Sequence, residues 1–411
     1  MEQHKGSGHS FKLMVGTYFL AWGFAGLDRL LIAMLFPLVL PEFGLGFAEG
    51  GLLMAAMALS YLVFAFVGGV LSDKFGRKKV ILPSVFLFSI GSAITGAVGS
   101  FAQLIGIRSI IGAAEGAFNM SATAQIAEES PPEKRGLYVG LYTSAFPLFA
   151  SLVAPLYATQ AAAAWGWRMA CYLTIIPGII LAAIIWFGIK ESKRFETSAA
   201  PECKETSSWK EIITQKNILV GSLIAIFWMI WLWSWLSFGM SFLVSVKGFD
   251  SATAGMLMAA LGLGGFLGCF LLPALSDKVG RKLPIIVGPI IGFLGTLAIL
   301  NIPASSFGLL AGTMFITAFS TWGLAPIFLS VIPSEAVPAK LCGTGIGVVT
   351  CIGELAGIVI APPLLGMIAD KSGLGTAMLC SAVPLIAVII FSFFLQETAP
   401  RLVNVSKEST N

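Results

Sequence analysis

The sequence predicts an all-α, polytopic membrane protein in which twelve transmembrane helices form two six-helix pseudo-repeats around a central cavity. Three observations lead to this fold class. First, 57% of the 411 residues are hydrophobic and only 11% are charged, whereas about a quarter of the residues of a soluble domain are charged. Second, twelve apolar runs are long enough to cross a bilayer, which takes about 20 residues each. Third, one loop motif occurs twice. The composition excludes an ordinary water-soluble enzyme.

The twelve predicted helices are apolar runs bounded by charged or Pro/Gly-rich segments. Their approximate limits are 13–38, 49–72, 79–99, 101–127, 136–160, 168–189, 217–245, 252–275, 283–302, 306–332, 342–369 and 374–396. An even count places both termini on one side of the membrane. Twenty Lys and Arg residues fall on that side and three on the other, so the positive-inside bias predicts that both termini are cytoplasmic. We therefore expect a multi-pass protein of the plasma membrane, which is the inner membrane in a bacterium.

A long polar stretch divides the predicted helices into two sets of six. It covers 190–216 and is predicted to be a cytoplasmic linker. The predicted domains are an N-terminal bundle at 1–189, a C-terminal bundle at 217–400 and a cytoplasmic tail at 401–411. Parallel six-helix repeats joined in this way are one known plan for a secondary transporter.

The two bundles carry the same loop motif. LSDKFGRKK follows the second predicted helix and LSDKVGRK follows the eighth, 204 residues later. The repeat pairs Asp73 with Asp277, Gly76 with Gly280 and Arg77 with Arg281. Glycine permits a sharp reversal, the aspartate can accept hydrogen bonds, and the basic residues can meet the anionic leaflet. One interpretation of the motif is that it only fixes topology.

A second, weaker sequence repeat relates EESPPEKRG (128–136) to SEAVPAKLCG (334–343). It aligns Glu129 with Glu335 at an offset of 206 residues. The two repeats are separated by nearly equal numbers of residues, which indicates an internal duplication and not a chance similarity.

Five ionisable residues lie inside predicted helices, where each costs about 2.5–3.5 kcal/mol on insertion scales. They are Asp28, Arg29, Arg108, Glu115 and Glu354. Such residues need a partner or a wet cavity. They mark the candidate site.

Helix periodicity places the charges of the fourth predicted helix on one face. Arg108, Gly112, Glu115 and Asn119 follow a spacing of 3.6 residues per turn. Counting residues from the membrane surface places Asp28 and Arg108 in the same, outer half of the bilayer. This face is predicted to line a polar cavity.

Two interpretations of these charges stay open. In one, they are an internal salt-bridge network that joins the first and fourth helices. In the other, Arg29 or Arg108 binds a substrate carboxylate, because arginine suits bidentate contact, and Glu115 or Asp28 takes up a proton. The five charges sum to 2 − 3 = −1, and adding one monoanion with one proton leaves that sum unchanged. Symport of an anion with protons therefore avoids charge accumulation.

Aromatic residues and Asn119 complete the candidate substrate site. Trp228, Trp231 and Trp235 share one face of the seventh predicted helix, too deep for an interfacial belt. They either pack the bundle or, together with Tyr142, line a cavity for an aromatic or otherwise bulky acid.

At this point the sequence resembles the major facilitator superfamily (MFS) over essentially its whole length. The resemblance is carried by GGVLSDKFGRKK, LSDKVGRK, GIRSIIGAAEGAF, PPEKRG, WGWR and ETAPR. It implies the MFS fold, and it implies that the repeated loops latch the two halves on the cytoplasmic side.

Within that superfamily, LDRLLIA (27–33) and RSIIGAAEGAF (108–118) resemble the organic anion:cation symporter branch. The resemblance implies roles in anion binding and proton coupling for Asp28, Arg29, Arg108 and Glu115. Glu354 departs from that branch. It is either a second protonation site or a hydrogen-bonded packing residue.

The sequence thus predicts a secondary active transporter, not an enzyme, that imports a small organic anion with protons by alternating access. No cofactor besides the coupling proton, no metal and no nucleic acid is expected, and we expect a monomer in the lipid bilayer. A proton-coupled exporter of drugs or metabolites and a sugar or polyol carrier are the alternatives. Buried arginines are harder to explain for a neutral substrate.

Overall fold

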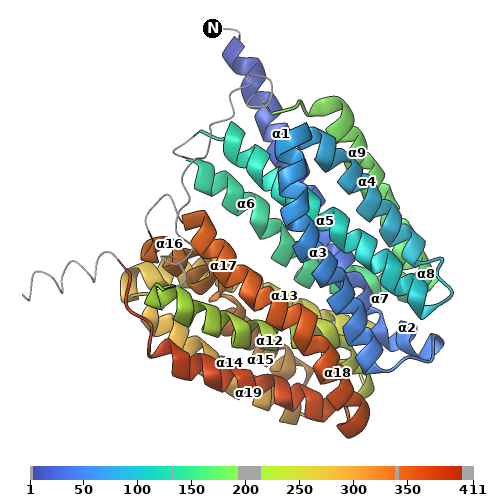
Figure 1. Ribbon diagram of the computed structural model, residues 1–411. Coiled ribbons are helices and arrows are strands. Elements are labelled where there is room, and N and C mark those ends of the chain that lie inside the picture. Colours follow the sequence, from blue (N-terminus) through green and yellow to red (C-terminus); the bar gives the residue numbers. More distant parts are fainter. Residues whose placement is uncertain (1–2, 132–133, 193–213, 338–341, 400–411) are drawn as a thin grey trace, which may run out of the picture. The chain divides into compact units, whose positions relative to one another are not determined.

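The computed structural model describes residues 3–131, 134–192, 214–337 and 342–399, and all regular structure in these ranges is helical (Figure 1). The chain divides into two compact units. The first contains residues 1–43 and 53–203, and the second contains residues 44–52 and 204–411. The division falls within the predicted linker, most of which lies outside the described residues, as does the predicted tail at 401–411.

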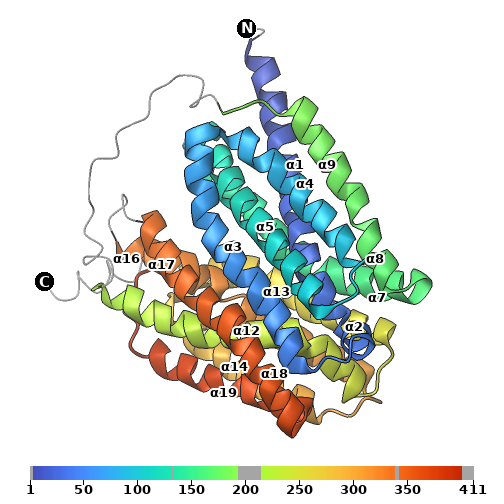
Figure 2. The same ribbon diagram turned by 45° about the vertical axis from the view of Figure 1, so that its right-hand side comes forward.

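The first unit is built from the N-terminal helices. They are α1 (Gln3–Met34), α2 (Phe36–Glu42), α3 (Phe47–Phe75), α4 (Arg77–Thr95), α5 (Phe101–Glu129), α6 (Arg135–Leu148), the π-helix η2 (Phe149–Val153), α7 (Ala154–Trp165), α8 (Trp167–Leu173) and α9 (Ile175–Gly188). The part of α3 before residue 53 is grouped with the second unit. Figure 2 shows α4 alongside α5 and α9, which are its main packing partners. The Ser100 hydroxyl accepts a hydrogen bond from the Gln103 amide and so caps α5.

The second unit repeats this arrangement of helices. They are α12 (Lys216–Ser245), α13 (Ser251–Val279), α14 (Lys282–Asn301), α15 (Phe307–Trp322), the π-helix η3 (Ile327–Val331), α16 (Ile332–Ala336), α17 (Cys342–Glu354), the π-helix η5 (Leu355–Ile360), α18 (Ala361–Ser372) and α19 (Leu374–Ser392). Its best-packed pairs are α13 with α15 and α12 with α19.

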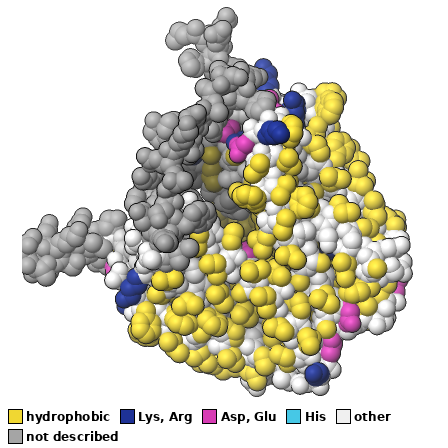
Figure 3. All heavy atoms as spheres, in the orientation of Figure 1, with side chains coloured by type: hydrophobic (Ala, Val, Ile, Leu, Met, Phe, Trp, Pro, Cys, Tyr) yellow, Lys and Arg dark blue, Asp and Glu magenta, His cyan; other side chains and the backbone are white. Residues whose placement is uncertain are grey.

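The prediction of a multi-span helical membrane protein is confirmed. In the described part of the chain, ten helices are long and apolar enough to cross a membrane, and α1 with α2 makes an eleventh if the bent pair counts as one span. The remaining predicted span is α5, a helix of 29 residues that is less apolar because it carries the charged and amide side chains of the candidate site. Hydrophobic side chains are spread widely over the described part of the face seen in Figure 3.

Prolines interrupt several spans. The axes of α1 and α2 differ by 55°, and Pro37 stands in the first turn of α2, where its missing N–H costs nothing. The π-helix η2 lies between Pro147 and Pro155, and η3 follows Pro326.

The repeated loop motif forms a side-chain clasp in the first unit. The Arg77 guanidinium lies 2.5 Å from the Asp73 carboxylate and 2.7 Å from that of Glu128. It also donates to the Ser72 hydroxyl at 2.6 Å, and Ser192 donates to Glu128 at 2.8 Å. The loop is therefore tied to the C-terminal end of α5 and, through Ser192, to the segment that follows α9.

The second unit has the same clasp. Arg281 lies 2.5 Å from Asp277 and 2.9 Å from Glu335, and Thr398 donates to Glu335 at 2.5 Å. Because Arg77 pairs with Glu128, the counterpart of Glu335 is Glu128. The predicted alignment of Glu335 with Glu129 was wrong by one residue.

A carboxylate from the end of each unit caps the helix that follows the motif. Glu191 accepts from the Lys78 amide at 3.1 Å, and Glu397 accepts from the Arg281 and Lys282 amides at 2.8 and 3.1 Å. Burial raises the pKa of Glu397, but the backbone N–H groups that donate to it lower its pKa further, to below the ordinary value. A lowered pKa means that this stabilisation is present above the ordinary pKa and is lost as the pH falls.

Gly76 and Gly280 make the two reversals possible. Their φ angles are +110° and +97°, which a residue with a Cβ adopts only with strain. At Gly76 a Cβ would also lie 2.6 Å from a carboxylate oxygen of Glu191.

We expect Gly76→Ala to lower the free energy of unfolding by about 1–3 kcal/mol, because strain and a clash add. Thermal unfolding in detergent measures this. Gly106→Ala is the matched control, since it lies within α5, has open space around its Cα and should be neutral or slightly stabilising. Equal melting temperatures for Gly76→Ala and wild type would contradict the requirement for glycine.

Candidate functional site

Glycines on α5 bring α3 close enough to form one wall of the site. A Cβ at Gly112 would lie 2.1 Å from the Met57 carbonyl oxygen, and one at Gly116 would lie 2.4 Å from that of Tyr61. Only glycine allows the two backbones to approach this closely. Tyr61 of α3 is thereby held against the face of α5 that carries Glu115.

Arg29 of α1 and Glu115 of α5 form a buried ion pair. Nε and Nη2 of Arg29 donate to Oε2 of Glu115 at 3.1 and 2.8 Å. Arg29 is 5% exposed and Glu115 is fully buried. Oε1 of Glu115 has no hydrogen-bond partner among the described residues. The pair thus uses one carboxylate oxygen, which leaves the contact short of full bidentate geometry.

Three aromatic rings surround the Arg29 guanidinium. Its central carbon lies 4.2 Å from the ring centroid of Tyr61, 5.1 Å from that of Phe146 and 5.9 Å from that of Trp22. Trp22 also stacks on Tyr142 at 6.0 Å. Arginine above aromatic faces is stabilised by cation–π attraction. We call Trp22, Tyr61 and Phe146 the aromatic box.

Asn119 links two tyrosines one helical turn from Glu115. Its amide nitrogen donates to the Tyr61 hydroxyl at 2.7 Å, and its amide oxygen accepts from the Tyr142 hydroxyl at 2.9 Å. Asn119 is half-buried, whereas Tyr142 is fully buried. Asn119 therefore fixes the edge of the aromatic box.

Arg108 and Asp28 lie beside this pair but make different contacts. Nη1 of Arg108 donates to the Asp28 carbonyl at 3.1 Å, and Nη2 donates to the Arg29 carbonyl at 2.9 Å. The two residues are 2% and 3% exposed. Nε of Arg108 and Oδ1 of Asp28 lack hydrogen-bond partners among the described residues. The structure therefore brings together all four charges that the sequence singled out in the first bundle, but it ion-pairs Arg29 with Glu115 and places Arg108 on the backbone.

The predicted tryptophans lie in the second unit and are buried. The Trp228 indole donates to the Thr321 carbonyl at 2.7 Å, and the Trp231 indole donates to the Thr296 hydroxyl at 2.9 Å. Trp235 is fully buried, and its indole nitrogen has no partner among the described residues. These contacts hold α12 against α14 and α15. A substrate contact for the three tryptophans stays a prediction.

Glu354 lies at the last residue of α17, half-buried, where the helix changes to the π-helix η5. Gly353 and Gly357 beside it pack against α12, since a Cβ would lie 3.0 Å from Ala225 and 2.4 Å from Met229. A π-helical turn often accompanies a functional site. Both predicted roles of Glu354 stay open.

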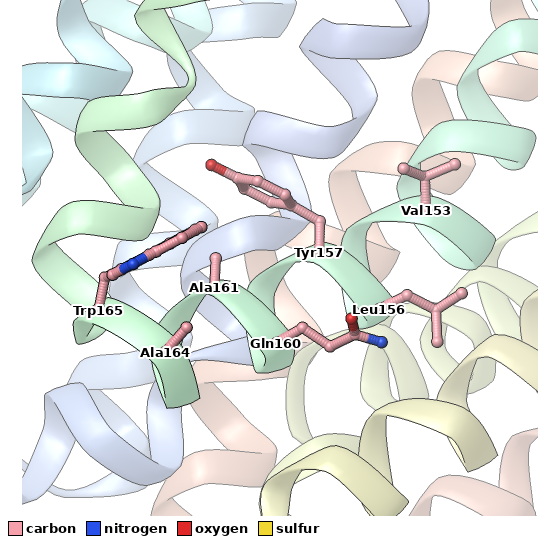
Figure 4. Close-up of a pocket in the computed structure, with 7 residues that line it drawn as sticks. All are labelled: Val153, Leu156, Tyr157, Gln160, Ala161, Ala164 and Trp165. Carbon is pink, nitrogen blue, oxygen red and sulfur yellow. The ribbon is translucent and has the colours of Figure 1, made fainter.

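A surface pocket of about 440 Å³ lies elsewhere in the first unit. Its lining comes from η2 and α7, and Figure 4 shows Ala161 between Tyr157 and Trp165 on one helix face. The pocket contains none of the predicted site residues, and its lining carries no charge. Among the described residues, no three His, Cys, Asp or Glu side chains come together as a metal site.

Sequence reasoning missed Tyr61 and Phe146. Both lie in strongly apolar spans, where an aromatic residue gives no signal of its own. The only available clue was the spacing of Gly112 and Gly116, which marks a face suited to close helix packing. That spacing indicates a contact but does not say which residue of α3 fills it.

The architecture defines the class of protein. An all-helical, multi-span protein with two units that carry the same clasp, and with a charged cluster buried within the first unit, is built as a membrane transporter. A family model described as the Major Facilitator Superfamily matches residues 18–360, and the chain belongs to this family. It is therefore a secondary transporter and not an enzyme.

Curated relatives match almost the whole chain. The hexuronate transporter of Bacillus subtilis is 26% identical over 381 residues, which cover 86% of this chain and 87% of the relative. The 3-(3-hydroxy-phenyl)propionate transporter of Escherichia coli is 28% identical over 405 residues, which cover 95% of each chain. The cis,cis-muconate transport protein of Acinetobacter baylyi is 26% identical over 403 residues, again 95% of each chain.

A solved structure shows the same fold. The bacterial homologue of the human lysosomal transporter Spinster superposes with a TM-score of 0.80 at 20% identity, over 93% of this chain and 96% of that chain. The predicted MFS fold is confirmed. The relatives are consistent with the anion:cation symporter branch that the sequence resembles.

Proposed function

We propose that the protein imports a small organic anion together with protons by alternating access, with Arg29 binding the anion and Glu115 taking up a proton. A substrate carboxylate would replace Glu115 on the Arg29 guanidinium. Protonation of the displaced Glu115 would keep the buried site electrically balanced, because one anion and one proton enter together. Asp28 and Glu354 are the further proposed protonation sites.

The observation that carries this proposal is the single-oxygen contact between Arg29 and Glu115. Nε and Nη2 of Arg29 both donate to Oε2 of Glu115, so a substrate carboxylate that accepts through both of its oxygens would bind these two nitrogens in better geometry than Glu115 does. The displaced carboxylate would be uncompensated in a dry site, which favours its protonation. A neutral sugar has no carboxylate that could replace Glu115 on Arg29.

The aromatic box supports a flat or bulky apolar acid. Trp22, Tyr61 and Phe146 line three sides of the guanidinium, and the polar atoms of Asn119 are already shared between two tyrosines. Aromatic walls of this kind suit a ligand that has an apolar body and one charged group, here a carboxylate bound by Arg29. Relatives named for a phenylpropionate and a muconate carry acids of that kind. Trp228, Trp231 and Trp235 are proposed to contribute from the second bundle.

We further propose that the protein works as a monomer in the plasma membrane with both termini in the cytoplasm. The distribution of basic residues supports the orientation. The domains are proposed to be the two bundles at 1–189 and 217–400, with 190–216 as their linker. The repeated clasps, with Asp73, Gly76, Arg77 and their partners Asp277, Gly280, Arg281, are proposed to serve gating.

Uptake by purified protein in proteoliposomes tests the function. The panel should contain monocarboxylates, dicarboxylates, sugar acids, aromatic acids and neutral sugars, each with and without an imposed pH gradient. We expect an organic acid to accumulate only when the outside is more acidic. Full transport of a neutral sugar by an Arg29→Gln, Arg108→Gln double variant would refute anion transport.

Asn119 provides a separate test of the aromatic box. We expect Asn119→Leu to raise KM for the transported acid about tenfold, because the hydroxyls of the half-buried Tyr61 and the buried Tyr142 lose their hydrogen bonds to Asn119, and loss of a partner by a buried polar group costs about 1–3 kcal/mol. Tyr142→Phe removes only one of the bonds and should have a smaller effect. Concentration-dependent uptake measures both, and an unchanged KM in Asn119→Leu would place the substrate away from this wall.

A further inference from the structure

Arg108 is bound in a way that differs from an arginine waiting for a ligand. A ligand-binding arginine presents its two terminal nitrogens to the incoming carboxylate. In this protein both terminal nitrogens of Arg108 donate to main-chain carbonyls, those of Asp28 at 3.1 Å and Arg29 at 2.9 Å. Its 2% exposure leaves little of the side chain accessible.

The two carbonyls belong to consecutive residues of α1. The contact therefore constrains the orientation of α1 as well as its distance from α5. Consecutive residues are about 100° apart around a helix. A planar guanidinium that bridges both carbonyls therefore defines the rotation of α1 as well as its height against α5. The contact lies close to the end of α1, since the helix stops at Met34 and the chain then bends by 55° into α2.

The rotation of α1 decides which side chain faces the site. In the present rotation Arg29 contacts Glu115 and the aromatic box, whereas Oδ1 of Asp28 has no hydrogen-bond partner among the described residues. A turn of α1 by one residue would bring Asp28 to the place of Arg29 and set two carboxylates against each other. Holding this rotation through each transport cycle is thus a requirement for rapid turnover.

We propose that Arg108 is a positioning residue that fixes the rotation of α1 through the carbonyls of Asp28 and Arg29, and that it does not contact the substrate carboxylate. This inference rests on the proposed function for its effect on transport. Lysine keeps the charge and can donate to the same carbonyls, but its ammonium lacks the rigid fork that fits two of them. Arg108→Lys should therefore retain part of the activity, and Arg108→Gln much less.

The first test compares a carboxylate with its neutral isostere. Binding of benzoate and benzamide is measured by competition against the transported acid in wild type, Arg108→Lys, Arg108→Gln and Arg29→Gln. We expect Arg29→Gln to lose the preference for the acid. Both Arg108 variants should keep that preference within about threefold, while their turnover falls about tenfold or more, with Arg108→Lys the less affected. Loss of the preference in Arg108→Gln to the extent seen in Arg29→Gln would overturn the proposal.

The second test needs no substrate. Single cysteine substitutions at positions 19 to 26 of α1, in a background without the native cysteines, are labelled with a membrane-permeant maleimide. We expect the labelling pattern to shift in Arg108→Gln, to shift less in Arg108→Lys and to stay as in wild type in Arg29→Gln. An unchanged pattern in Arg108→Gln would overturn the positioning role. A wild type that prefers no acid over its amide would instead refute the proposed function.

Discussion

Arg29→Gln should lower kcat/KM for the transported acid by at least about 100-fold, which corresponds to about 3 kcal/mol. The variant removes the only charged group that we propose to contact the substrate carboxylate, and truncating one partner of a buried charge pair costs about 2–5 kcal/mol. Arg29 is 5% exposed and pairs with Glu115 at 2.8 Å, so solvent cannot replace the lost contact. Initial uptake rates in proteoliposomes measure the effect.

Arg168→Gln is the matched control for this prediction. Arg168 is also an arginine of the first unit and also pairs with a glutamate, Glu42, but both of these side chains are 40% exposed. An exposed pair contributes about 0–1 kcal/mol, so uptake should stay near that of wild type. A loss of transport in the control as large as in Arg29→Gln would show that the assay reports folding and not substrate binding.

Glu115→Gln should abolish accumulation of the acid driven by a pH gradient while retaining exchange of internal for external substrate. Glutamine keeps the size of the side chain and can still accept a hydrogen bond from Arg29, but it cannot carry the proton. The substrate carboxylate would then meet an Arg29 that lacks a competing anion. We expect tighter binding of the acid and loss of coupling, measured by uptake with an imposed gradient and by counterflow.

Glu129→Gln controls for the loss of a carboxylate on the same helix. Glu129 is the last residue of α5, far along the helix from Glu115, and accepts a hydrogen bond from Gln125 at 3.2 Å. Its substitution should leave coupling intact. If Glu115→Gln still concentrates the acid in response to a pH gradient, Glu115 is not the coupling site, and Asp28 becomes the next carboxylate to test.

The fold was largely predictable because insertion into a membrane requires features that are easily recognised in a sequence. Apolar runs, basic loops and the duplicated LSD motif needed no three-dimensional information. The details depend on contacts between distant residues. The pairing of Arg77 with Glu128 could not be distinguished by sequence from a pairing with Glu129, because adjacent glutamates at a helix end are equivalent until the neighbouring helix is placed.

The charged residues of the candidate site could be predicted from the sequence, but the aromatic residues that surround Arg29 could not. Arg29, Arg108 and Glu115 are conspicuous because charge inside a membrane is costly. Periodicity placed Arg108 on the same face as Glu115, but it could not show that Arg108 reaches backbone carbonyls of α1. Tyr61 is one aromatic residue among many in apolar spans, and only the approach of α3 to α5 identifies it.

The two clasps also bear on synthesis of the chain. Every residue that closes the first clasp lies at or before Ser192, so the ribosome has delivered all of them before it begins the second bundle. The N-terminal helices can therefore complete the hydrogen bonds of the first clasp while the remainder is still being translated, in keeping with the tendency of domains to fold in order of synthesis. Duplication has thus given each unit a clasp that forms without side chains of the other unit.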